Sequence, residues 1–276
     1  MTYCKSQIQN VPGTINRLVA IQQVSTVFRI IVGGGDPYSV AYAIFKSLFN
    51  FGNFVGSEAI AISGITQANP GIVDTFPIVH GLVTGQYGVF SGIVGMTELN
   101  NVTGPEYTVV VLSPYTFSLK LSGIPVDTMA YIPYSSGGFF TPDIGSAYTQ
   151  TITINDYPDN YQVTFVTPPL QQLGIVANWL TTQPNFTSDV AIAQLAIPAL
   201  ITYINGLPVG YSVNALELQY IFITAIAPIL ASQYVSAVTF SFTLNGRVAI
   251  PVGNILIGDP QGYFNTDSAS IKVIQG

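Results

Sequence analysis

Residues 24–36 have the sequence VSTVFRIIVGGGD, and this stretch decides the fold of the N-terminal part of the chain. The run Val24–Val32 is rich in β-branched residues and predicts a central β-strand, which Gly33-Gly34-Gly35 ends. Asp36 is a favourable helix N-cap, and Pro37 suits the first helical position. Five apolar residues then recur at helical spacing: Val40, Ala41, Ile44, Phe45 and Leu48. We therefore expect a strand, a glycine turn and a helix.

The middle of the chain has a different composition, rich in Gly, Pro, Asn and Thr from about Gly64 to Gly138. Turn residues separate its short apolar runs, among them Gln86–Phe90, Tyr107–Leu112 and Thr116–Leu121. This pattern predicts a small all-β, barrel-like module without a long helix.

Longer elements return after Ser146. Two alternating runs, Thr151–Ile154 and Tyr161–Phe165, flank the turn-forming loop Asp156–Asn160 and predict a hairpin. Three further strands are expected at Leu173–Leu180, Val235–Leu244 and Ser270–Ile274.

Two helices are expected between these strands. Thr187 or Ser188 is the predicted cap of a helix that runs through Ile204 and stops at Asn205-Gly206. Asn214 and Glu217 have the spacing of a capping box for the next helix. Pro198 and Pro228 should bend or break these helices.

The fold class predicted from these elements is α+β. A mixed or antiparallel sheet with packed helices is interrupted by the inserted β module. The expected boundaries are residues 1–63 for the first part of the α+β domain, 64–140 for the module and 141–276 for the remainder.

Composition excludes several functions. Only 7% of the 276 residues are charged and the net charge is −6, so phosphate neutralisation in nucleic-acid binding is not expected. One histidine and one cysteine supply neither a metal centre nor a disulfide. The apolar segments Val190–Ile204 and Leu218–Ala231 are short and contain prolines, so we expect helices packed on a sheet and no membrane partner. Sparse charge predicts an exterior covered by other proteins.

No residue pattern specifies a reaction, and neither an enzyme nor a small-molecule substrate is predicted. Gly33-x-Gly35 lacks the third glycine of a dinucleotide fingerprint, because position 38 is Tyr38. His80, beside Gly81, is interpreted as a structural or solvent-facing histidine. Cys4 is expected to be an inert thiol in an exposed terminus.

Two acidic groups are candidate sites, and we interpret both as solvated turns. Asp156 and Asp159 are the best carboxylate pair, and Asp259, Asn265 and Asp267 are the best oxygen-ligand group. Neither has the spacing of a known calcium loop. The expected sets of catalytic, cofactor-binding and metal-binding residues are therefore empty, and no cofactor is expected.

The outer regions resemble baseplate J-like proteins of contractile-tailed bacteriophages. The resemblance rests on residues 27–45, which match a Val-Gly-Gly-Asp strand and helix, and on the order of four later segments: Thr151–Asp156, Tyr161–Pro168, Phe240–Gly246 and Gly258–Phe264. Those proteins usually have a longer region before this strand, whereas only about 25 residues precede it here.

The middle region resembles a β module found in phage tail proteins and similar to the first catalytic cysteine half-domain of ubiquitin-activating enzymes. The matching segments are Asn69–Val73, His80-Gly81-Leu82, Gly85, Ser91-Gly92, Gly95–Asn100, Thr116–Leu119 and Tyr134–Gly138. This resemblance does not imply ubiquitin chemistry, because no cysteine lies in these segments.

The J-like resemblance implies a structural viral tail protein of the baseplate wedge and inner ring that links hub, sheath and outer baseplate and transmits the contraction signal. It implies assembly in the host cytoplasm and location in the virion. The implied partners are a second copy, a tail protein I-like subunit, a small gpW-like sheath initiator and the central hub. The alternative is a tail-fibre attachment or host-surface binding protein that acts through the inserted module.

Overall fold

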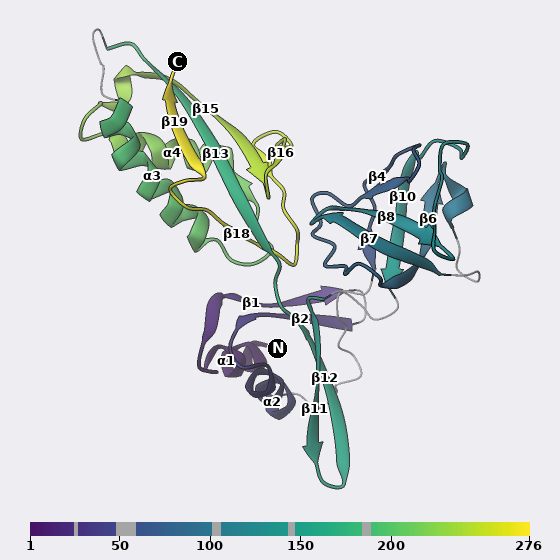
Figure 1. Cartoon of the computed structure of the whole chain (residues 1–276). Coiled ribbons are helices and arrows are strands. Elements are labelled where there is room, and N and C mark those ends of the chain that lie inside the picture. Colours follow the sequence, from purple (N-terminus) through teal and green to yellow (C-terminus); the bar gives the residue numbers. More distant parts are fainter. Residues whose placement is uncertain (25–26, 48–58, 101–105, 143–146, 184–188) are drawn as a thin grey trace. The chain divides into compact units, whose positions relative to one another are not determined.

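The computed structural model describes residues 1–24, 27–47, 59–100, 106–142, 147–183 and 189–276 (Figure 1). These ranges contain four α-helices and nineteen strands, so the α+β class is confirmed. Contacts group the chain into two compact units, Met1–Pro169 and Leu170–Gly276. The boundaries expected at 63/64 and 140/141 stay a prediction.

The first sheet belongs to the N-terminal unit. Its strand order is β1 (Thr14–Val24), β2 (Val27–Gly34), β12 (Asp159–Val166) and β11 (Thr149–Asp156). The predicted strand Val24–Val32 is wrong at its start, because Val24 ends β1 and pairs with Val27 at the beginning of the antiparallel strand β2. The β-branched run continues through this reversal, so strand propensity does not mark it. Strand β1 itself was not predicted.

Two helices, α1 (Thr2–Gln9) and α2 (Pro37–Ser47), pack against this sheet. The predicted start of α2 is confirmed, because Asp36 caps it and Gly34 and Gly35 adopt positive φ before it. Three of the predicted apolar positions of α2 are buried, while Leu48 lies outside the described residues. The core between helices and sheet contains Cys4, Ile8, Val19, Ile30, Val32, Val40, Ala41, Ile44, Ile154, Val163 and Phe165.

The predicted hairpin at residues 151–165 is confirmed. Strands β11 and β12 pair antiparallel from Thr149↔Val166 to Asp156↔Asp159, which leaves Tyr157 and Pro158 as the turn. Both strands are longer than the alternating runs that predicted them.

The β module is an eight-stranded sheet in the same unit. The order β3-β10-β6-β7-β8-β5-β4, with β9 beside β8, joins these strands: β3 (Ile60–Ala61), β4 (Gly64–Ile65), β5 (Ile72–Asp74), β6 (Tyr87–Val94), β7 (Tyr107–Ser113), β8 (Thr116–Leu121), β9 (Ile124–Pro125) and β10 (Ser136–Pro142). A short 3₁₀ turn follows β6 at Thr97–Leu99.

The module has the predicted all-β content, but its described strands do not form a closed barrel. The two ends of the sheet are instead joined by one chain segment, because β3 pairs with β10 and β4, only two residues later, pairs with β5. Aromatic side chains fill the interior, where the ring centroid of Phe140 lies 4.9 Å from that of Phe90 and 5.2 Å from that of Phe117.

The C-terminal unit contains a five-stranded sheet around the long strand β13 (Leu170–Thr181). On one edge, β15 (Val235–Leu244) pairs antiparallel with β13, and β16 (Arg247–Ala249) pairs with the end of β15. On the other edge, β18 (Tyr263–Asn265) and β19 (Ile271–Gln275) pair parallel with successive parts of β13. A separate pair joins β14 (Val213–Asn214) and β17 (Ile255–Leu256). The three strands predicted in this region are confirmed.

Helices α3 (Asp189–Gly206) and α4 (Ala215–Ile226) cover one face of this sheet (Figure 1). Helix α3 is long and apolar enough to cross a membrane by length and composition, and it packs on β18 and β19 through a stripe of four buried residues: Ile192, Ala196, Leu200 and Ile204. Its predicted caps, Thr187 and Ser188, lie outside the described residues.

Three details of these helices test the sequence predictions. Pro198 does not break α3, because packing on the sheet stabilises the helix around the missing N–H. Helix α4 ends at Ile226, before Pro228, as predicted. Asn214 is confirmed as the N-cap, but its side chain accepts a hydrogen bond from the N–H of Leu216 and not from that of Glu217, so the capping box is wrong.

Candidate protein-binding face of the β module

The glycine turn before α2 is occupied by a carboxylate. Asp36 accepts hydrogen bonds from the backbone N–H and the Oγ of Ser39, at 2.9 and 2.8 Å. These bonds lower the pKa of Asp36, so the charged form is favoured at the helix N-terminus. A phosphate bound there would be repelled by this negative charge. The Asp36 carboxylate therefore supports a structural role for the turn over dinucleotide binding.

His80 is buried in the core of the module, with 2% of its surface exposed. Its Nδ1 accepts a hydrogen bond from the N–H of Leu82 at 2.9 Å, and its Nε2 lies 2.8 Å from the carbonyl oxygen of Ser113. Because Nδ1 is an acceptor, the proton of the neutral ring is on Nε2 and is donated to Ser113. Burial lowers the pKa of His80. Both ring nitrogens are engaged, so His80 joins two backbone groups as a neutral side chain.

Cys4 does not lie in an exposed terminus as predicted. It is 1% exposed, because α1 packs its Cys4 and Ile8 face into the core of the first sheet. Burial raises the pKa of its thiol to about 11, and the protonated thiol is a poor nucleophile.

The acidic groups weighed as sites lie in separate turns. Asp156 and Asp159 face each other across the exposed end of the β11–β12 hairpin. Asp267 caps its own turn by accepting the N–H groups of Ala269 and Ser270. Hydrogen bonds from the side chain of Ser270 and from its N–H lower the pKa of Asp267.

Asp259 was expected to be solvated and is instead buried, with 4% exposure. Its N–H donates to Oε1 of Gln171, and its carboxylate accepts the N–H of Gln261. Within the described ranges, no group of three or more His, Cys, Asp or Glu side chains could hold a metal ion.

The segment Gly95–Asn100 fixes the shape of the module. Gly95 adopts φ +91°, and a Cβ there would lie 2.2 Å from the carbonyl oxygen of Pro133. The Oδ1 of Asn100 accepts a hydrogen bond from the N–H of Ile93, and its Nδ2 donates one to the carbonyl oxygen of Ile93, both at 2.9 Å. The side chain thus makes the two hydrogen bonds that a neighbouring strand would make. Glu98 accepts a hydrogen bond from a loop N–H at 2.9 Å. Two further residues of the segment are fully buried: Met96 and Leu99. Five of the six residues in this motif therefore have a structural cause.

One outward surface of the module presents two exposed aromatic side chains. We call it the module face; it consists of Tyr87, Val89, Thr108, Lys120 and Phe139. Pairing places Thr108 opposite both Tyr87 on β6 and Lys120 on β8, and it places Phe139 of β10 opposite the β6 residue four positions beyond Tyr87. The Cα atoms of Tyr87 and Phe139 are therefore offset by about 13 Å along the strand direction.

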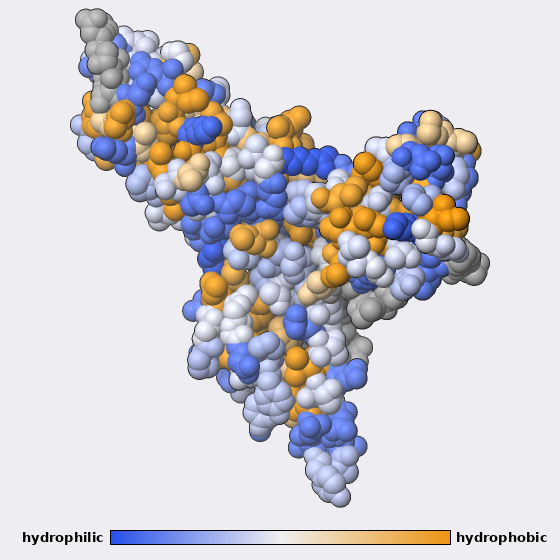
Figure 2. All heavy atoms as spheres, in the orientation of Figure 1, coloured by the Kyte–Doolittle hydropathy of each residue, from blue (hydrophilic) through white to orange (hydrophobic). Residues whose placement is uncertain are grey.

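The two aromatic side chains of the module face are 48% and 49% exposed. Figure 2 shows hydrophobic residues gathered on the surface of the module. Exposed aromatic side chains on a rigid sheet provide large contact area at a low entropic cost, and Lys120 is the only charged member of this face. This arrangement is suited to binding another protein.

The module matches a known family. The model of the Ubiquitin-activating enzyme E1 FCCH domain matches residues 68–143. The chain is 40% identical over 106 residues to Ubiquitin-like modifier-activating enzyme 6 of Mus musculus, which covers 37% of this chain and 9% of that protein. It is 45% identical over 84 residues to the Homo sapiens protein of the same name, which covers 29% of this chain and 7% of that protein. It is 38% identical over 78 residues to Ubiquitin-like modifier-activating enzyme 1 of Oryctolagus cuniculus (28% and 7%).

The alignments thus span less than a tenth of the length of these relatives. The predicted resemblance of the middle region to this half-domain is confirmed.

Three predictions are contradicted by these matches. The similarity points to proteins of ubiquitin-like modifier activation, and not to a viral tail or baseplate protein, to wedge and hub partners or to a location in the virion. Those predictions rest on residues 27–45 and on four later segments, whereas the matched family lies in the module, outside all of these segments.

The module face was missed from the sequence, although β6 contains a signal for it. Outward positions of a solvated strand are usually polar, whereas here they include Tyr87 and Val89. Between them, Gly88 has no side chain because a Cβ would lie 2.4 Å from the Phe140 ring. Gly88 therefore interrupts the alternation of apolar and polar side chains in β6. As a result, the sequence does not show which residues of this strand point outward.

Proposed function

We propose that this chain is a non-catalytic protein-binding component that acts through the module face. The observation that carries the proposal is the pair of half-exposed aromatic side chains, Tyr87 and Phe139, on adjacent strands of the FCCH-like module. The engaged ring of His80 and the buried thiol of Cys4 support a binding role over a catalytic one.

The relatives of the module are named as activating enzymes for ubiquitin-like modifiers. A ubiquitin-like modifier or an enzyme that handles one is therefore the first partner to test. The proposal keeps one part of the alternative derived from the sequence, namely that the chain binds another protein through the module. It does not include a tail fibre or a host surface as the partner.

Titration of the chain with ubiquitin, followed by calorimetry and by NMR shifts of the module amides, tests the proposal. We expect Tyr87→Ser and Phe139→Ser each to weaken binding about tenfold, because exposed aromatic anchors carry much of the energy of such interfaces. Ile124→Ser is the matched control, since Ile124 is a 71% exposed residue of the module on β9. Absence of binding, or an equal loss in the control, would overturn the proposal.

For the flanking regions, a finer assignment rests on the resemblance of residues 27–45 and of the four later segments to baseplate J-like proteins. We propose that the first sheet with α2 shares the fold of baseplate J-like proteins. The Asp36 cap and the positive φ of Gly34 and Gly35 support this, because they make the Gly-Gly-Asp sequence a structural requirement. The proposal concerns the fold of that region only, and it assigns neither partners nor location.

A further inference from the structure

The sheet of the C-terminal unit has one face that its helices do not cover. Four alternate side chains of β13 are buried in the core of the unit: Leu173, Ile175, Ala177 and Trp179. The residues between them point to the opposite face of the sheet. On that open face, Val248 of β16 is 69% exposed, and Ile250, which follows β16, is 83% exposed. Aliphatic surface is therefore left in contact with water.

Strand register aligns one row of side chains across this open face. Lys272 of β19 pairs with Val176 of β13, and Val176 pairs with Ser241 of β15. The β15–β16 register, continued by one residue, places Ile250 opposite Ser241. Because directly paired residues point to the same face, the row begins with an ammonium group and ends with an aliphatic side chain.

A second row lies beside the first and makes the middle of the face low. Gly174 of β13 pairs with Thr243 of β15, and Thr243 pairs with Val248 of β16. A Cβ on Gly174 would lie 2.3 Å from Oγ1 of Thr243, so this position has no room for a side chain. The second row therefore also ends in an aliphatic residue, at the same side as Ile250.

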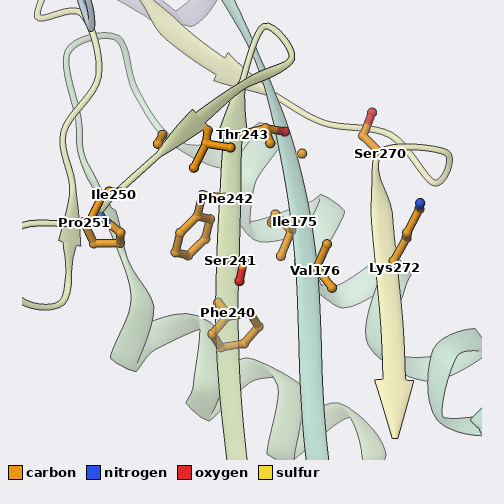
Figure 3. A pocket seen from close by; sticks show the side chains of 13 residues that line it. Ile175, Val176, Phe240, Ser241, Phe242, Thr243, Ile250, Pro251, Ser270 and Lys272 are labelled. Carbon is orange, nitrogen blue, oxygen red and sulfur yellow. The ribbon is translucent and has the colours of Figure 1, made fainter. Parts of the chain in front are cut away.

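A groove of about 490 Å³ runs over both rows. Figure 3 shows Lys272 on one side of the groove, Ile250 and Pro251 on the other, and Val176 and Ser241 between them. Its volume is within the range of small-ligand pockets, about 300–1,000 Å³. Strands β13 and β15 separate β19 from β16, so three interstrand spacings make the groove about 14 Å across.

The two sides of the groove differ in charge. Lys272 is exposed and is the one charged residue among the described residues that line the groove. Within the described part of the chain, no hydrogen bond or ion pair engages its ammonium group. Asp267 is the nearest acidic residue in the sequence, and its carboxylate accepts the N–H groups of Ala269 and Ser270. The groove thus has a free cation at one side and aliphatic surface at the other.

We propose that this groove binds a single-chain aliphatic carboxylate of about ten carbons. The carboxylate pairs with Lys272, and the chain crosses Val176 and Ser241 to cover Ile250. Each C–C bond of about 1.5 Å advances an extended chain by about 1.3 Å, so about ten carbons reach most of the way across. A cationic amphiphile would be repelled by Lys272, and a phosphate monoester has a second negative charge that the groove does not pair. The site lies in the C-terminal unit and does not depend on the module face.

Titration of the full chain with decanoate, followed by calorimetry and by NMR shifts of the backbone amides, tests the proposal. We expect saturable one-to-one binding, with the largest shifts at Val176, Ser241, Ile250 and Lys272. From hexanoate to decanoate, the affinity should rise about twofold for each added methylene, which is half of the full transfer value because the groove covers one side of the chain. The increase should stop beyond about twelve carbons, where the chain passes the edge of β16.

Reversal of the charge at the head-group end is the first variant test. Lys272→Glu should weaken decanoate binding about tenfold, because repulsion replaces attraction at an exposed site. The same variant should bind decyltrimethylammonium, which the unmodified chain should not bind. Lys5→Glu is the matched control, since Lys5 is an exposed lysine of α1, and it should change neither affinity.

Shortening the aliphatic end is the second variant test. Ile250→Ser should weaken decanoate binding about threefold and leave hexanoate nearly unaffected, because the shorter chain does not reach this residue. Ile257→Ser is the matched control, since Ile257 is a 51% exposed residue of the same unit that does not line the groove.

Equal affinity of decanoate for the unmodified chain and for Lys272→Glu would overturn the proposal. Absence of shifts in the groove at millimolar decanoate, or an affinity that does not depend on chain length, would also overturn it. So would self-association of the chain that is lost in Ile250→Ser and is not dispersed by decanoate, because a second copy would then cover this face.

Discussion

Replacement of His80 by leucine should destabilise the module strongly. The change removes the acceptor of the Leu82 N–H and the donor to the Ser113 carbonyl, at 2.9 and 2.8 Å, in a site that is 2% exposed. Each buried backbone group left without a partner costs about 1–3 kcal/mol, so the two together should cost about 2–6 kcal/mol. His80→Gln is the matched control, because its amide retains a donor and an acceptor.

Amide hydrogen exchange in the full chain is the appropriate assay. The single tryptophan, Trp179, lies in the C-terminal unit, so its fluorescence does not report on the module. The slowest module amides should exchange with an opening free energy that is about 2–6 kcal/mol lower in the leucine variant. A loss below about 1 kcal/mol would show that these two hydrogen bonds do not stabilise the module.

The pH dependence provides a second measurement on the same residue. Burial lowers the pKa of His80 below its ordinary value of 6.5, so the unfolded module binds a proton more readily than the folded one. The stability should be complete above about pH 7 and should decline as the pH falls below 6.5 toward the folded pKa. The Gln variant should lack this component. An identical pH profile in both proteins would contradict the assignment of a neutral, buried ring.

Three further predictions concern other parts of the chain. Gly88→Val should destabilise the module by about 3 kcal/mol or more in the same exchange assay, because a Cβ would lie 2.4 Å from the Phe140 ring; a stable variant would contradict the packing described. Cys4 should react with a thiol reagent at pH 8 only after unfolding, since it is 1% exposed; immediate reaction would show that α1 does not cover it. Asn214→Ala should cost about 1 kcal/mol through loss of the α4 N-cap, measured by urea unfolding followed through Trp179; an unchanged midpoint would exclude the cap as a stabilising contact.

Local signals in the sequence were sufficient for much of the secondary structure. Strand β15 begins and ends as its alternation predicts, and the Asp36 cap appears where its neighbours require it. Strand β1 was missed because polar residues such as Arg17 and Gln22 interrupt its apolar pattern on an edge strand. The antiparallel pairing of Val24 with Val27 was not predicted, because the residues of both strands have similar strand propensity.

The candidate site could not be predicted because strand register creates it. Tyr87, Lys120 and Phe139 are distant in sequence and share a face only through the pairing of β10, β6, β7 and β8. A shift of one residue in any of these ladders would turn one of the side chains inward. The family resemblance identified the module, but it contained no information on which outward residues are apolar.

The segment that joins the two ends of the module sheet has a practical consequence for dissecting the protein. The family match begins at residue 68, whereas the residues that pair with β10 and β5 lie at 60–65. A fragment cut at the family boundary would leave β10 and β5 without the strands that pair with them in the intact chain, and newly exposed strand edges favour aggregation. Any dissection of this protein should therefore retain residues 60–65, which lie before the start of the family match.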